Sequence, residues 1–159
     1  MRLTTHASAV ARHLSAEALF DRVADPAAAR EFFRGFGPVP AIAEVRLLSS
    51  GPLAAGARRE IVMADGSTLW EQVTEFDRPR RHRYRIERCG PPLSRLVSEA
   101  AGTWTFEPEE QGARVTWKYE YVVASIWVVP VALLFVKVLM RGAMRRAVAR
   151  LCQPPPARS

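Results

Sequence analysis

The chain has few of the residues that build disulfide frameworks, metal centres and covalent active sites. Its two cysteines, Cys89 and Cys152, lie far apart, in no CxxC motif and near no histidine pair. The sequence therefore predicts neither a disulfide framework nor a zinc site, and a reduced, cytoplasmic setting fits best. Serine, cysteine or lysine nucleophile motifs, Gly-rich phosphate loops and metal-ligand spacings are also missing. We therefore expect no metal and no cofactor.

Acidic residues are scarce relative to basic ones. Against 23 lysines and arginines there are 16 aspartates and glutamates, which gives a net charge of +7 and favours an anionic partner such as a lipid headgroup, a nucleic acid or an acidic ligand. Nucleic-acid binding would usually add exposed aromatic residues or a recognition helix, and neither is visible, so this partner is disfavoured. A solvated sheet face is the simpler interpretation of the arginine-rich band: Arg58, Arg59, Arg78, Arg80, Arg81, Arg83, Arg85 and Arg88.

Length and composition predict one globular domain. With 159 residues, 48% of them hydrophobic and 25% charged, the chain suits a single core, which we place in residues 1–152. The Pro-rich residues 153–159 are expected to form a disordered tail. Arg12 and His13 interrupt the apolar residues near the N-terminus, so no secretory signal is expected.

The first third of the chain predicts a strand followed by two short helices. Alternating residues favour a strand within residues 3–14. Ser15 can cap a helix over residues 15–25, and Asp25 can cap a second over residues 25–35, with Pro26 at its first helical position.

From residue 42 onward the apolar period changes from helical spacing to alternation, which is typical of strands. Short connections between the strands favour antiparallel neighbours, and Asp65 and Gly66 favour a tight primed hairpin turn. The longer link, residues 89–102, is expected to hold a helical turn or a loop over an opening. The six predicted strands cover residues 42–49, 57–63, 67–76, 81–88, 102–107 and 113–123.

A long helix is predicted from Pro130 to Leu151, about 33 Å in length. Lys137, Arg141 and Arg145 form a polar row along it. Its apolar face repeats at spacings of three and four residues and contains Leu133, Val136, Met140, Ala143, Met144, Ala147 and Leu151.

This order of elements predicts an α+β fold in which a curved, seven-stranded antiparallel sheet wraps around the C-terminal helix. Local likenesses are "SAEALFDRVADPAAAREFF", "SSGPLAAGARRE", "WEQVTEFDRPRRHRYRI" and "GARVTWKYEY". On these stretches and their order, residues 5–151 resemble the START-like helix-grip superfamily, in particular the SRPBCC group of polyketide cyclases/dehydrases and lipid-transport proteins. The resemblance implies an apolar cavity between sheet and helix.

Strand alternation indicates which side chains would line such a cavity. Two interpretations stay open for them: they fill the core, or they bind an apolar ligand with a few fixed hydrogen bonds. The candidate ligand-binding residues are Tyr84, Ile86, Trp104, Phe106, Trp117, Tyr119 and Tyr121 from the sheet, and Leu133 and Met140 from the helix.

Two residues are weak catalytic candidates. If Leu69 and Val73 point inward, Glu71 becomes a carboxylate inside the sheet, and His82 on the next strand is a possible acid–base partner. A solvated or salt-bridged Glu71 and a structural His82 are the simpler interpretations. No catalytic residue of the family can be matched, so the resemblance carries no chemistry by itself.

Three functions therefore remain open. The chain is a carrier or sequestering module for a lipid, isoprenoid or polyketide-like molecule, or a cyclase or dehydrase, or a membrane-associated form of either. The last is held by residues 121–140, where sixteen residues without charge precede Lys137. A bilayer span needs about 20 apolar residues, reached only if Lys137 snorkels; the alternative is an exposed apolar lip on a soluble domain. The oligomeric state is left open.

Overall fold

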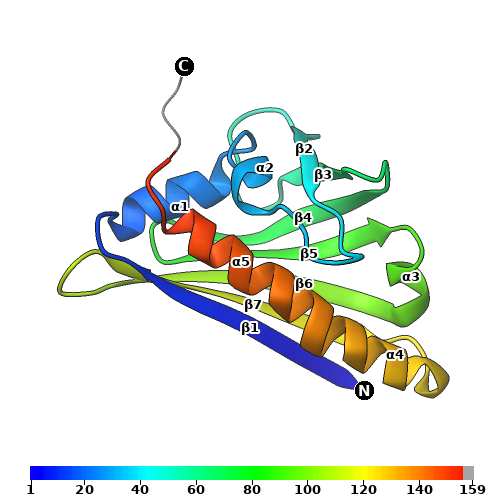
Figure 1. Ribbon diagram of the computed structural model, residues 1–159. Helices are drawn as coiled ribbons and strands as arrows, with labels where there is room; N and C mark the ends of the chain where they lie inside the picture. Colours follow the sequence, from blue (N-terminus) through cyan, green and yellow to red (C-terminus); the bar gives the residue numbers. More distant parts are fainter. Residues whose placement is uncertain (156–159) are drawn as a thin grey trace.

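The computed structural model describes residues 1–155, so the predicted tail lies partly outside the described residues, from residue 156 on. Seven antiparallel strands form one curved sheet in the order β1-β7-β6-β5-β4-β3-β2, with the C-terminal helix lying across one face (Figure 1). The predicted helix-grip fold is confirmed. The strands are β1 (Arg2–Ala11), β2 (Ile42–Leu47), β3 (Arg58–Met63), β4 (Thr68–Asp77), β5 (Arg81–Cys89), β6 (Val97–Pro108) and β7 (Ala113–Val123).

The strands match their predicted positions closely except for β6, which begins five residues earlier than expected, at Val97 rather than Gly102. The turn between β3 and β4 also differs from the prediction. Gly66 has a φ of 85°, while Asp65 keeps a negative φ. A primed two-residue turn of the Asn-Gly type requires positive φ at both positions, so this connection is a different, longer turn.

Two short helices cover one end of the sheet. The Ser15 hydroxyl accepts a hydrogen bond from the Ala18 amide at 3.1 Å and caps α1 (Ala16–Ala24) as predicted. The second helix, α2 (Ala29–Phe32), is shorter than predicted because Asp25 and Pro26 belong to a preceding turn, where the Asp25 carboxylate accepts from the Ala27 amide at 3.0 Å. The link after β5 holds a helical turn, α3 (Leu93–Leu96), as one of the two expectations had it.

The C-terminal helix is continuous but not uniform. It begins with a 3₁₀ turn, η1 (Ile126–Val128), and continues through α4 (Val129–Leu134), a π-helical segment η2 (Phe135–Met140) and α5 (Arg141–Leu151). The sequence predicted regular α-helix throughout. Within residues 1–155, the segment Ile126–Leu151 is the one helix long and apolar enough to cross a bilayer by length and composition, but the same segment also packs into the core.

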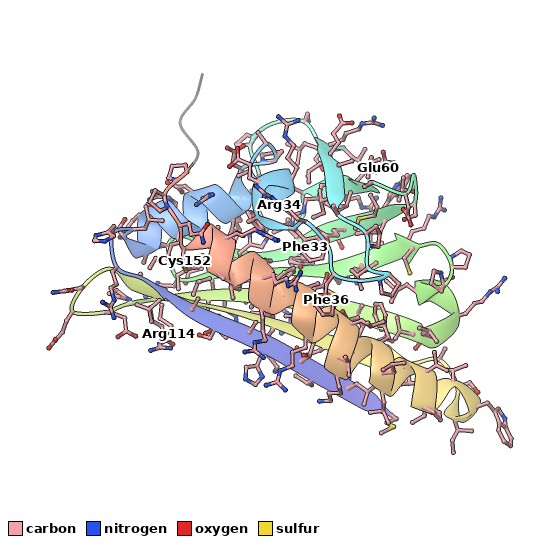
Figure 2. The ribbon with its side chains drawn as sticks, in the orientation of Figure 1. Phe33, Arg34, Phe36, Glu60, Arg114 and Cys152 are labelled. Carbon is pink, nitrogen blue, oxygen red and sulfur yellow. The ribbon has the colours of Figure 1, made fainter. Side chains whose placement is uncertain are left out.

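One stripe of the helix lies against the sheet. Ala132 and Val136 are fully buried, and the stripe continues along α5 to Leu151. Phe36, from the loop after α2, lies over the helix where a Cβ on Gly142 would come within 2.8 Å of its ring (Figure 2). These contacts fix the helix and enclose the space between it and the sheet.

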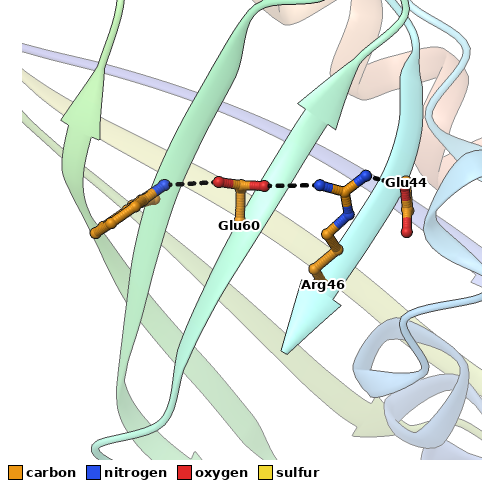
Figure 3. A network of polar contacts seen from close by, with 4 residues as sticks. Glu44, Arg46 and Glu60 are labelled. Atoms are coloured by element: carbon orange, nitrogen blue, oxygen red, sulfur yellow. Dashed lines mark hydrogen bonds and ion pairs between the residues drawn. The ribbon is translucent and has the colours of Figure 1, made fainter. Parts of the chain in front are cut away.

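The outward face of the sheet carries paired charges. Arg46 contacts Glu44 at 2.9 Å and Glu60 at 3.4 Å, and the Trp70 indole N–H donates to the other oxygen of Glu60 at 3.0 Å (Figure 3). Six arginines of the predicted basic band also have a carboxylate partner. Arg58, Arg78, Arg80, Arg81, Arg83 and Arg85 each lie within 3.5 Å of a carboxylate, and Arg88 stacks over Trp70. The exception is Arg59, which lies inside the fold.

Candidate ligand-binding site

A cavity of about 210 Å³ lies between the sheet and the C-terminal helix. Its wall is mainly apolar, and its rim includes the loop after α2, the turn between β3 and β4, and the segment before α3. The principal wall residues are Phe32, Phe33, Val39, Ile42, Val45, Arg59, Ile61, Met63, Leu69, Glu71, Tyr84, Ile86, Leu93, Trp104, Trp117, Tyr119, Tyr121, Phe135 and Met140.

Stacked aromatic rings from β6 and β7 form one side of this wall. Trp104 and Trp117 lie opposite each other in the strand register, with ring centroids 4.3 Å apart and an interplanar angle of 11°. Tyr119 and Tyr121 stack at 5.1 Å along β7. Alternation along β7 brings these side chains to one face, as the sequence predicted, and their packing against each other leaves flat apolar surfaces toward the cavity.

A hydrogen-bonded group of three aromatic side chains gives the cavity a polar side. The Tyr84 hydroxyl donates to the Tyr119 hydroxyl at 3.1 Å and accepts from the Trp117 indole N–H at 3.2 Å. Tyr84 reaches this position because its register partner is Gly102, where any Cβ would collide with the phenol ring. Burial raises the pKa of Tyr84 and of Tyr119, so both hydroxyls stay protonated and available for hydrogen bonds.

An ion pair lies next to the tyrosines. The Arg59 Nε–H group donates to the Glu71 carboxylate at 2.8 Å, and the side chains are only 10% and 6% exposed. Strand alternation turns both side chains inward, because Ile61 and Val73 on the same strands are buried. The Arg59 guanidinium also lies 5.2 Å from the centre of the Tyr84 ring. Burial raises the pKa of Glu71, and the attraction of Arg59 opposes that rise.

The position of Arg59 corrects one sequence-based interpretation and resolves another. Arg59 was grouped with the solvated arginines, yet it pairs with a buried carboxylate. Glu71 satisfies both alternatives raised from the sequence, since it faces the interior and is salt-bridged. The predicted partnership of Glu71 with His82 is wrong, because Glu71 lies opposite Ile86, about 13 Å along β5 from His82.

His82 lies in an aromatic part of the core and does not line the cavity. Its ring is fully buried, with ring centroids 5.4 Å from Phe76 and 5.9 Å from Tyr84. Neither ring nitrogen has a hydrogen-bond partner among residues 1–155. Burial, with a smaller contribution from the Arg59 charge, lowers the pKa of His82 to about 3, so the ring is neutral at physiological pH.

Seven of the nine candidate ligand-binding residues lie on the cavity wall: Tyr84, Ile86, Trp104, Trp117, Tyr119, Tyr121 and Met140. Phe106 instead packs in the core, with its ring 5.4 Å from Phe20. Leu133 is half-buried and does not reach the wall. The π-helical segment η2 has about one more residue per turn than an α-helix, and this shifts the buried position of the helix from Leu133 to Ala132. That these residues bind a ligand stays a prediction.

Sequence reasoning missed the wall contributed by the α2 region and by Arg59. Phe32 and Phe33 fall within the second predicted helix, residues 25–35, but their place over the sheet depends on how the chain turns after β1. Phe33 contacts the Trp117 ring edge-on at 5.8 Å. The clue for Arg59 was alternation: it lies two residues before the apolar Ile61 and so faces the same side.

Comparison with solved structures finds the same fold in proteins of low sequence identity. A protein from Nitrosospira multiformis matches with a TM-score of 0.66 and 17% identity over 94% of both chains. Norcoclaurine synthase from Thalictrum flavum, in complex with dopamine and hydroxybenzaldehyde, matches with a TM-score of 0.66 and 17% identity, over 95% of this chain and 86% of the other. The di-domain ARO/CYC BexL from the BE-7585A biosynthetic pathway has a TM-score of 0.71 and 18% identity, over 99% of this chain and 51% of BexL.

At these identities the structural matches show the fold alone. Comparison with curated proteins returns no match. A family model for polyketide cyclase/dehydrase and lipid transport matches residues 3–153, which is nearly the whole chain. The chain therefore belongs to the polyketide cyclase/dehydrase and lipid transport family, within the SRPBCC superfamily.

Proposed function

We propose that this protein binds an apolar small molecule with one polar end inside the cavity, as a carrier or sequestering module. The observation that carries the proposal is a mainly apolar cavity with a single buried ion pair, Arg59–Glu71, on its wall. Ligand sites typically combine apolar walls with a few fixed polar groups that orient the ligand. A lipid, an isoprenoid or a polyketide-like molecule has this combination of apolar body and polar end.

Arg59 is the group best suited to recognise the polar end. Of the three nitrogens of the Arg59 guanidinium, only Nε has a hydrogen-bond partner within residues 1–155. The two Nη groups are left to donate to a ligand. Glu71 holds the guanidinium in place against the Tyr84 ring. A ligand carbonyl, phenolate or carboxylate oxygen would accept from these donors while the rings of Trp104 and Trp117 contact its apolar part.

Native mass spectrometry of the freshly purified protein is the first test, and a retained small molecule is the expected result. The second is titration with 1-anilinonaphthalene-8-sulfonate, whose aromatic body and anionic group match the cavity. Ile86→Trp, on the cavity wall, is expected to weaken probe binding by about tenfold or more, since the larger ring fills the space. The matched control is Arg85→Trp, on the outward face of the same strand, which should leave binding unchanged.

The proposal fails if no molecule is retained and the probe does not bind. It also fails if Ile86→Trp and Arg85→Trp bind the probe equally well, because the binding surface would then lie outside the cavity. Circular dichroism and thermal unfolding of both variants separate a lost site from a lost fold.

An acid–base reaction on the bound molecule is the second candidate, favoured by one observation. Glu71 is a cavity-lining carboxyl whose pKa is raised by burial, as in residues that exchange protons with substrates. If this is the function, Glu71→Gln should still retain the copurified molecule but no longer convert it when products are followed by mass spectrometry. Equal conversion by Glu71→Gln and the natural protein would rule out this role.

A further inference from the structure

Apolar side chains are exposed along the start of the C-terminal helix. Trp127 is 89% exposed and Ile126 78%, and Val131, Leu134 and Val138 are each more than half exposed. Five of the nine large exposed apolar residues within residues 1–155 thus fall in one stretch of thirteen residues. Surface apolar residues scattered singly need no explanation, but a contiguous patch marks an interaction site.

Basic residues continue the same exposed face. Arg141 and Arg145 follow Val138 at spacings of three and four residues and are exposed, and Lys137 lies beside them. No aspartate or glutamate occurs between residues 121 and 155. Within the described part of the chain neither arginine contacts a carboxylate, whereas Arg58, Arg83 and Arg85 on the sheet each lie within 3.5 Å of one. The helix surface is thus apolar at its start and carries unpaired positive charge beyond it.

This face borders the rim of the cavity. Phe135 and Met140, on the inner side of the same helix, line the cavity, as does Leu93 at the start of α3. Figure 1 shows α3 and α4 side by side at the end of the molecule where β1 begins, and the two helices are in contact. A surface that rests against the exposed face would therefore lie next to an opening into the fold.

We propose that the exposed face of residues 126–145 docks onto the surface of an anionic phospholipid bilayer. Trp127, Val131 and Leu134 enter the boundary between headgroups and acyl chains, where tryptophan is favoured, and Arg141 and Arg145 contact headgroup phosphates. The inference stands independently of the ligand in the cavity, because it rests on the outer side of the helix.

The charge pattern distinguishes this partner from a second copy of the chain. A two-fold symmetric contact brings the same patch together from both copies, and because this patch contains no aspartate or glutamate, Arg141 and Arg145 would be covered with no carboxylate to pair with. Packing distinguishes docking from a full span. Ala132, Val136 and Ala143 are buried against the rest of the fold, and a span would expose that stripe.

Vesicle sedimentation of the full chain tests the proposal. Vesicles of phosphatidylcholine with about one-third phosphatidylglycerol should bind the protein, and vesicles of phosphatidylcholine alone should bind it about tenfold or more weakly, since each basic residue near an anionic surface adds to the attraction. Trp127 is the most exposed of the four tryptophans, since Trp104 and Trp117 are buried and Trp70 is half-buried on β4, so the emission change that is lost in a Trp127→Phe variant reports on this residue. Its emission should shift to the blue on binding, and brominated lipid should quench it.

Two double variants test separately how the apolar residues and the basic residues of the exposed helix face contribute to vesicle binding. Trp127→Ser with Leu134→Ser should reduce binding to the anionic vesicles by about tenfold or more, as less apolar surface enters the bilayer. Arg141→Gln with Arg145→Gln should remove the preference for anionic lipid. The matched controls, which should bind like the natural protein, are Leu47→Ser with Leu48→Ser, two exposed apolar residues at and just after the end of β2, and Arg12→Gln with Arg30→Gln, which removes the same charge elsewhere.

Several outcomes would overturn the proposal. One is no binding to anionic vesicles, and another is equal binding by both helix variants and their controls. A concentration-dependent dimer that the Trp127→Ser, Leu134→Ser variant abolishes would assign the face to self-association. Retention in the bilayer after high-salt and alkaline washing would show a span. Probe binding in the cavity should survive in both helix variants, so failure here is distinguishable from failure of the proposed ligand site.

Discussion

Replacement of His82 with leucine is expected to flatten the acid dependence of stability. The ring is fully buried, both of its nitrogens lack a partner among the described residues, and its pKa in the folded protein is about 3 against an ordinary value of 6.5. Between these two pH values the unfolded chain binds a proton at this site and the folded protein does not. The free energy of unfolding therefore falls as the pH drops from about 6.5 toward 3.

The size of this effect follows from the two pKa values. On moving from about pH 7 to about pH 4.5, protonation of His82 in the unfolded state alone lowers the free energy of unfolding by about 2.5 kcal/mol. His82→Leu removes that term and the unsatisfied ring nitrogens with it, at a similar side-chain volume. At pH 7 the free energy of unfolding of the variant should lie within about 1.5 kcal/mol of that of the natural protein. At pH 4.5 the variant should be the more stable of the two.

Urea unfolding of both proteins at the two pH values, followed by circular dichroism, measures the difference. Carboxylates also titrate in this range, but they are present in both proteins and cancel in the comparison. The decisive quantity is the loss of stability between the two pH values, which should be about 2.5 kcal/mol smaller in His82→Leu. Equal losses in the two proteins would refute the argument that burial keeps this histidine neutral.

Two further predictions concern the polar side of the cavity. Glu71→Leu should destabilise the fold by about 3–5 kcal/mol in urea unfolding, because it leaves a buried arginine that cannot lose its charge. Arg59→Met should cost less stability, since the Glu71 carboxylate can take up a proton. The double variant should recover most of the stability lost in Glu71→Leu. If the two single variants cost the same, the asymmetry argument is wrong. Gly102→Ala should cost about 1–3 kcal/mol and weaken probe binding by displacing the Tyr84 ring, whereas Ala101→Gly, its neighbour on the strand, should leave probe binding intact.

Local rules predict those parts of this protein whose physical cause is local. Alternation along β7 placed Trp117, Tyr119 and Tyr121 inward, and Ser15 marked a helix start. The pairing of side chains across strands depends instead on register. Glu71 meets Arg59 because β4 and β3 pair at those positions, and His82 lies four residues from the place where it would reach Glu71. Neither the short connections nor the periodicity of one strand determines such a register, which is set by the turns and by packing of the whole sheet.

The π segment connects the two surfaces of the C-terminal helix. A regular α-helix advances about 100° per residue, so one extra residue between α4 and α5 rotates everything before it relative to the part held against β1. That rotation exchanges Leu133 for the smaller Ala132 at the buried position. Phe135 then lies on the cavity wall, while Leu134 faces outward. An α-helical register carried back from α5 would bury a leucine there instead of the alanine. The irregular turn therefore decides which residues in the first half of the helix face the cavity and which join the exposed, basic-flanked surface.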